Sequence, residues 1–268
     1  MRTRHPSMKH HFARVAPRYR EMRDLDVTAV REIAWILRYL ARSELRTVIL
    51  DVGSGTGRYL ESLLAESALE TTRRCCAVRY DAVREMLGGT SLFKGLPSRS
   101  IKSVVGLAEC LPFAAGSIDA VLAFNAIHHF AVTGFLAEVG RVLRPGGRVI
   151  IYTRTPEQNR CTVWGRFFPR FADKEDRLFT ERELAAVVDQ TGAFGKVELR
   201  VVPWRVETDL RRLIEQARSG AYSTFEFYSR SEFANGVETF ERRVLDHFED
   251  PLRIVVQNDH LLAVATKG

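Results

Sequence analysis

The chain is poor in cysteine, with four in 268 residues, and these four follow neither a zinc-binding spacing nor a disulfide framework. Cys75 and Cys76 are neighbours in a strand pattern, where a thiol is usually a small buried hydrophobe. Cys110 and Cys161 stand apart from them and from each other. The sequence therefore predicts reduced thiols, no metal site and no cysteine catalysis, as is typical of a cytoplasmic protein.

Long apolar runs are also missing. No stretch of 18 apolar residues occurs, and the N-terminus lacks the apolar segment of a secretory signal. The chain contains no internal repeat and no low-complexity segment, and its hydrophobic content of 46% suffices for a buried core. We expect a soluble cytoplasmic protein without a membrane span, folded as one large domain or slightly more.

Acidic residues are scarce at the N-terminus. Residues 1–23 hold seven Lys and Arg against one acid, Glu21, so this segment supplies +6 of the formal net charge of +7. A basic arm can bind RNA, anionic lipid or an acidic substrate. It can equally be a solvated, partly disordered leader, and its Arg-rich composition faintly resembles that of a transit peptide.

One apolar strand pattern runs into an acid, Asp51, and then into three glycines at every second position, Gly53, Gly55 and Gly57. A turn from strand to helix around a ligand needs backbone conformations that a Cβ forbids. The N–H groups that open the following helix then point at the ligand. A dinucleotide fingerprint requires G-x-G-x-x-G, but here Arg58 occupies the third glycine's place, which disfavours NAD and FAD.

Strand and helix patterns alternate along most of the chain. Helices are predicted over residues 27–43, 58–67, 82–87 and 132–143 and after a capping box at 180–183, and strands over 47–51, 75–80, 104–107, 118–124, 148–153, 197–204 and 260–266. Such alternation with continuous apolar strands indicates a doubly wound parallel α/β sheet. Residues 205–258 are predicted to form two or three inserted helices, which at the ligand edge of a sheet usually make a cap.

Residues 154–178 combine arginines with aromatic side chains at positions 164, 167, 168 and 171. Basic and aromatic side chains together can bind a nucleic acid or an anionic aromatic metabolite. The aromatic positions also have simple helical spacing, so we favour a core role for them.

Five sequence blocks resemble motifs of the class I S-adenosylmethionine (SAM) methyltransferases. The pattern Asp-x-Gly-x-Gly-x-Gly at 51–57 resembles the first motif, and the later blocks follow in the family's order at 81–87, 108–119, 125–130 and 143–147. The resemblance is close over residues 45–155 and looser to residue 268. It implies a Rossmann-like, mostly parallel seven-stranded sheet with an antiparallel last strand.

This resemblance also implies a division of the chain and a cofactor. We expect a basic arm over residues 1–26, a SAM-binding core over 27–204, a helical cap over 205–258 and the last core strand over 259–268. SAM is the expected cofactor, and no metal is required.

The resemblance assigns cofactor-binding roles to individual residues. Asp51 should orient the ammonium group of SAM, and Asp81, after the second strand, should accept hydrogen bonds from both ribose hydroxyls. Asp81 could alternatively be a helix N-cap, and Asp51 a strand-end cap. The other expected cofactor-binding residues are Tyr19, Gly53, Ser54, Gly55, Gly57, Leu107, Ala108, Glu109 and Asn125. Tyr19 would close over SAM as the family's N-terminal tyrosine does, or else belong to the core.

Leu107 departs from the family pattern, in which an Asp at this position receives the adenine amino group. The backbone of Ala108 and packing are then expected to hold the adenine, at a loss of about 1.5–3 kcal/mol for one hydrogen bond to a charged group. The departure leaves a SAM-fold binding protein without catalysis as an alternative.

Three residues are predicted to be catalytic. Asn125 should lie beside the transferable methyl group. Adjacent histidines are not expected to face one ligand together, so one of His128 and His129 should be structural and the other should line the acceptor site. An imidazole there could serve as a base toward a hydroxyl or an amine.

The predicted function is SAM-dependent methyl transfer, achieved mostly by proximity and orientation. The glycine-loop half resembles quinone-biosynthesis and other small-molecule methyltransferases, so a small-molecule acceptor is expected. Residues 126–130 and 151–158 also resemble tRNA wobble-uridine methyltransferases, which would suit the basic arm. Those enzymes do not obviously share the 205–258 insertion, so tRNA is the second expectation. The sequence predicts no oligomeric state.

Overall fold

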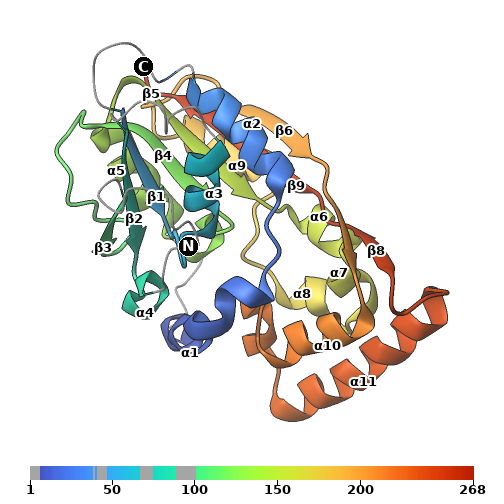
Figure 1. The fold of residues 1–268 in the computed structure, drawn as a ribbon. Helices are drawn as coiled ribbons and strands as arrows, with labels where there is room; N and C mark the ends of the chain where they lie inside the picture. The colour runs from blue at the N-terminus through green and yellow to red at the C-terminus, as the bar shows by residue number, and fades with distance from the viewer. Residues whose placement is uncertain (1–6, 39, 41–46, 67–74, 89–100) are drawn as a thin grey trace.

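A computed structural model describes residues 7–38, 40, 47–66, 75–88 and 101–268. Its centre is a seven-stranded sheet with the strand order β3-β2-β1-β4-β5-β9-β6 (Figure 1). The strands are β1 (Thr47–Val52), β2 (Cys75–Asp81), β3 (Ile101–Val105), β4 (Ile118–Phe124), β5 (Leu143–Thr153), β6 (Glu198–Val202) and β9 (His260–Thr266). The pairs from β3 to β5 are parallel, whereas β9 is antiparallel to both β5 and β6. The predicted doubly wound sheet with an antiparallel last strand is confirmed.

Helices cover both faces of this sheet. On one face α2 (Val27–Arg38) and α3 (Arg58–Glu66) pack on strand residues such as Ile49. On the other face α5 (Val132–Val142) and α9 (Glu181–Asp189) pack on the alternate residues of the same strands, such as Leu50, which follows Ile49 in β1. Successive strand residues point to opposite faces, so the two apolar clusters share the same strands. Full burial of one Leu or Ile side chain stabilises the folded state by about 1.5–3 kcal/mol relative to leaving that side chain exposed.

The carboxyl ends of the parallel strands position the site. The glycine loop follows β1, Asp81 ends β2, and Asn125 follows β4. The strand order reverses between β1 and β4, and ligands of doubly wound folds bind outside the carboxyl ends at such a switch point.

Several strand and helix boundaries differ from the predictions; β5, for example, begins at Leu143 rather than at residue 148, and β6 ends at Val202 rather than at residue 204. The predicted helix 27–43 ends at Arg38, and residues 41–43 lie outside the described residues. The predicted strand 104–107 is displaced to Ile101–Val105, because Ile101 pairs with Ala77 and the chain leaves the sheet at Gly106. Leu107 therefore lies on the loop after β3 rather than in the strand.

Residues 205–258 form more than the expected helices. The helices are α10 (Leu210–Arg218), the 3₁₀ helix η3 (Ser223–Phe227) and α11 (Arg230–His247), but the segment begins with β7 (Arg205–Thr208) and ends with β8 (Ile254–Gln257). β7 and β8 pair antiparallel and carry the chain away from the main sheet and back (Figure 1). The expectation of helices alone missed these strands, because four residues are too short for a period to be recognised.

The 154–178 segment forms α6 (Pro156–Cys161), α7 (Val163–Phe167) and α8 (Phe171–Lys174). Of these, α7 and α8 share an apolar cluster with α10, η3 and α11. The ring of Trp164 stacks on that of Phe240 from α11, with centroids 4.9 Å apart. The predicted core role of the aromatic residues is confirmed.

The basic N-terminal segment contains a packed helix, α1 (Ser7–Met22), rather than a solvated leader. Val15 and Met22 are buried, and three of its arginines form ion pairs with distant acids: Arg14 with Glu226, Arg18 with Glu215 and Arg20 with Glu61, at 2.6–2.8 Å. Residues 1–6 lie outside the described residues. None of the described helices is long and apolar enough to cross a membrane.

Candidate functional site

A cavity of about 590 Å³ opens at the carboxyl ends of the strands. Its volume lies within the range of roughly 300–1,000 Å³ that is usual for small-molecule sites. Segments from the glycine loop, the end of β2, the loop after β3, the end of β4 and α1 line it. The predicted site residues among its lining are Tyr19, Gly53, Ser54, Gly55, Asp81, Leu107, Ala108, Asn125, His128 and His129.

The glycine loop has the conformation that its sequence predicts. Gly53 has a φ of +69°, and a Cβ at this position would lie 2.6 Å from the Cβ of Ala126. Gly55 has a φ of +52° and donates its backbone N–H to the Asp81 carboxylate at 2.8 Å. The backbone thus forms one wall of the cavity, where side chains would fill the space.

Asp81 is anchored by the backbone while it faces the cavity. Its two carboxylate oxygens accept hydrogen bonds from the N–H groups of Gly55 and Val83, each at 2.8 Å. Burial raises the pKa of Asp81, although these hydrogen bonds oppose the shift. A carboxylate has about four acceptor positions, so two remain for ligand hydroxyls.

Asp51 lies behind the cavity wall and is not among the lining residues. Its side chain is 1% exposed, and its Oδ1 has no hydrogen-bond partner. Burial, assisted by the negative charge of Asp81, raises the pKa of Asp51 to about 8. A cation placed near this carboxyl group would therefore favour its ionised form.

Gly57 and Glu109 are likewise absent from the lining and hold neighbouring segments in place. Gly57 has a φ of +75°, and a Cβ there would approach the Arg79 side chain to 2.8 Å. Arg79 in turn donates to the Leu87 carbonyl at the end of α4 (Arg84–Leu87). Glu109 accepts a hydrogen bond at 2.6 Å from the N–H of Ala131, which precedes α5.

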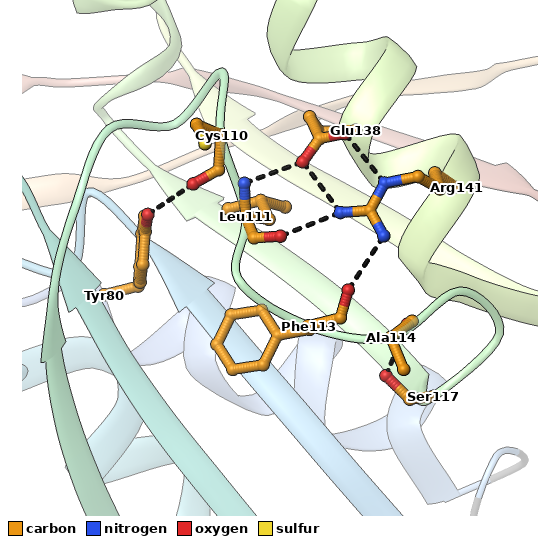
Figure 2. A network of polar contacts seen from close by, with 8 residues as sticks. All are labelled: Tyr80, Cys110, Leu111, Phe113, Ala114, Ser117, Glu138 and Arg141. Atoms are coloured by element: carbon orange, nitrogen blue, oxygen red, sulfur yellow. Dashed lines mark hydrogen bonds and ion pairs between the residues drawn. The ribbon is translucent and has the colours of Figure 1, made fainter.

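The loop that follows β3 and carries the lining residues Gly106, Leu107 and Ala108 is fixed by a polar network (Figure 2). The hydroxyl of Tyr80 donates to the Cys110 carbonyl at 2.7 Å. Glu138 of α5 accepts from the Leu111 N–H, while Arg141 donates to the Leu111 carbonyl, both at 2.7 Å. The hydrogen bond from Arg141 lowers the pKa of Glu138. The network holds this loop at the cavity edge.

Both histidines line the cavity, in contrast to the expectation that only one would. They end the 3₁₀ turn η2 (Ile127–His129) directly after β4, and their ring centroids are 4.1 Å apart. The His129 ring contacts Phe12 edge-on, and its Nδ1 lies 3.3 Å from the Arg177 guanidinium. The His128 Nδ1 is buried without a partner. Burial is the main reason why the pKa values of His128 and His129 lie well below 6.5, so both rings are neutral at pH 7.

A smaller compartment of about 60 Å³ adjoins the main cavity. The two share Phe12, Tyr19, Asn125, His128 and His129. The remaining lining residues come from α6, α8, η3 and nearby loops: Arg23, Arg154, Asn159, Phe171, Glu175, Leu178, Ala221, Tyr222, Ser223 and Thr224. The inserted segment thus reaches the site.

The polar lining residues that were not predicted as site residues include Arg154, Asn159 and Arg177. Arg154 directly follows β5, so the same carboxyl-edge argument that selects Asn125 could have found it. The positions of Asn159 and Arg177 at the site depend on tertiary packing, which no local sequence pattern shows.

Comparison with known proteins gives consistent results. Residues 50–151 match the model of the methyltransferase domain family. An uncharacterised methyltransferase of Mycobacterium tuberculosis is 30% identical over 201 residues, which cover 71% of this chain and 69% of that protein. A demethylmenaquinone methyltransferase of Deinococcus radiodurans is 34% identical over 152 residues, which cover 54% and 59%.

The fold is also found in solved structures. A crystal structure of an Anabaena variabilis protein, assigned as a methyltransferase of an antibiotic biosynthesis pathway, superposes with a TM-score of 0.64 at 18% identity and covers 91% of this chain and 99% of that one. The sheet order, the glycine loop and the acid at the end of β2 define a class I SAM-dependent methyltransferase. The chain belongs to this methyltransferase family and is an enzyme. The predicted family is confirmed.

Proposed function

We propose that this enzyme transfers a methyl group from SAM to a small-molecule acceptor. The observation that carries the proposal is the junction of the two cavities at Asn125, His128 and His129. A large cavity that suits the cofactor meets a small one that suits the reactive end of an acceptor, and three polar side chains lie at the boundary.

The residues of the larger cavity fit SAM. The glycine loop leaves room for ligand atoms against the backbone, and Asp81 keeps acceptor positions for the ribose hydroxyls. Asp51, buried without a partner on Oδ1, would balance the ammonium group. Leu107 and Ala108 would pack against the adenine. When bound, SAM supplies an activated methyl group on its sulfonium.

The boundary residues would orient the acceptor. Asn125 has a φ of +50°, a conformation in which Asn is enriched, and it lines both cavities. His128 is neutral, so its ring can accept a hydrogen bond from an acceptor hydroxyl or amine. Holding the nucleophile in line with the methyl group would supply most of the rate enhancement.

The small size of the smaller compartment, about 60 Å³, favours a small molecule over tRNA. Phe12 and Tyr19 of α1 line one side, and η3 residues including Ser223 line another. The α1 arginines that would serve a phosphate backbone are engaged by acids, as with Arg14 and Glu226 at 2.6 Å. Residues 205–258 would act as the cap of the acceptor site. The demethylmenaquinone methyltransferase relative also acts on a small molecule, by its name.

Methyl-labelled SAM tests the proposal. The enzyme would be incubated with labelled SAM and either a small-molecule extract of its host cells or the host's tRNA. We expect label in the small-molecule fraction, and none when Asp81→Ala replaces the wild type. Transfer of label to tRNA alone would contradict the proposal, as would the absence of transfer to either fraction by a protein that binds SAM.

A further inference from the structure

The smaller compartment contains a buried arginine without an acidic partner. Arg154 is 8% exposed. Its Nη2 donates to the Asn258 side-chain oxygen at 2.5 Å and to His260 Nε2 at 3.2 Å, and both are neutral groups. Its Nε is buried with no partner, and no carboxylate of the described residues lies within 4.0 Å of its guanidinium. Burying an unpaired charge is costly, which indicates that a ligand completes this site.

Other donors lie around the same space. The side-chain nitrogen of Asn159 is buried without a partner, as is the Nδ1 of His128. The guanidinium of Arg23 lies over the Tyr222 ring, 4.1 Å from its centroid, and donates to a backbone carbonyl. All of these residues line the compartment.

The acid in the lining does not balance this positive charge. Glu175 receives two hydrogen bonds from Arg177, at 2.5 and 2.7 Å, and one from Thr224 at 2.6 Å. Its charge is therefore balanced by Arg177. The charges of Arg23 and Arg154 remain without a counter-charge in the lining.

The compartment is the size of a small anionic group. The compartment has a volume of about 60 Å³, and one water molecule needs about 10–15 Å³ of cavity volume. The compartment therefore holds roughly four waters, which is the space that one carboxylate or phosphate group takes up. We propose that Arg154, Arg23 and Asn159 bind the oxyanion, a carboxylate or a phosphate, of the methyl acceptor. This deepens and rests on the proposed function: the acceptor is an anionic small molecule whose charged end enters the compartment. Its nucleophile then lies toward Asn125 and His128.

Three probes with the same ring test the proposal: benzoate, phenyl phosphate and neutral benzamide. Binding of each would be measured by ligand-observed NMR on the full chain, with and without S-adenosylhomocysteine (SAH), the demethylated product of SAM. The variants are Arg154→Met, the smaller change Asn159→Ala, and Arg182→Met as a control, since Arg182 is exposed on α9. Calorimetry with SAH shows whether each variant keeps its cofactor site.

We expect benzoate or phenyl phosphate to bind at least tenfold more tightly than benzamide, and the one that does so identifies the oxyanion. Arg154→Met should weaken that binding at least tenfold and Asn159→Ala severalfold, with SAH affinity and the Arg182→Met control unchanged. Equal binding of all three probes, or oxyanion binding unaffected by both site variants, would overturn the inference while SAH binding stands. Oxyanion binding by a protein that fails to bind SAH would instead refute the proposed function alone.

Discussion

Removal of the buried carboxyl group at Asp51 should change how cofactor binding depends on pH. Burial raises its pKa to about 8 in the free enzyme, and the ammonium group of the ligand should favour the ionised form. At pH 6.5 about 3% of the free enzyme is then ionised, so the apparent SAH affinity is about 30-fold below its limit at high pH. Between pH 6.5 and 7.5 the wild-type affinity should rise about eightfold, and it should level off only above pH 8.

Titration calorimetry in two buffers of different ionisation enthalpy measures both the affinity for SAH and the number of protons that are released when SAH binds. We expect release of close to one proton per SAH at pH 6.5 in the wild type, and neither release nor pH dependence in Asp51→Asn. The control Asp189→Asn, at an exposed position at the end of α9, should behave as wild type. A wild-type affinity that is flat from pH 6.5 to 7.5 would refute the assigned role of Asp51.

Three further outcomes follow from the site. Asp51→Asn should also raise the free energy of unfolding at pH 7, by up to about 4 kcal/mol. The reason is that the folded protein holds the Asp51 proton to a higher pH than the unfolded chain does, so the wild type loses stability as the pH rises from 3.8 toward 8. Chemical denaturation of both proteins at pH 5 and pH 7 would measure this difference. Gly106→Ala would bring a Cβ within 1.9 Å of the Tyr80 hydroxyl and should cost about 1–3 kcal/mol in thermal unfolding, whereas Gly195→Ala, with its nearest atom at 3.8 Å, should cost less; equal losses would refute the steric argument. Leu107→Asp should tighten SAH binding about tenfold by restoring an adenine acceptor, and unchanged affinity in a stable variant would mean that another group serves the adenine.

The parts of the site that could be predicted from sequence are those that local backbone rules dictate. The glycine loop must follow β1 because its turn demands positive φ, and Gly53 and Gly55 have it. Asp81 ends β2 and Asn125 follows β4, the two strands on either side of β1 in the parallel part of the sheet, so strand prediction alone brings them to one edge. The same rule placed Leu107 in a strand, where the structure has a loop, because the β3 register depends on pairing with β2.

The other parts depend on contacts between distant segments. α1 is polar overall, and its ion pairs, such as Arg14 with Glu226, join residues 212 positions apart. The smaller compartment combines Arg154 after β5 with Asn159 of α6 and Tyr222 before η3. No local pattern shows that these side chains meet, so its charge and size could not be deduced from the sequence.

A crystal structure of the enzyme with SAH tests the central claim most directly. The account predicts the adenosyl group in the larger cavity, with Asp81 accepting hydrogen bonds from the ribose hydroxyls. The sulfur should face the boundary with the smaller compartment at Asn125 and His128. SAH bound elsewhere, or with its sulfur turned away from that boundary, would contradict both the cofactor site and the proposed route of the acceptor.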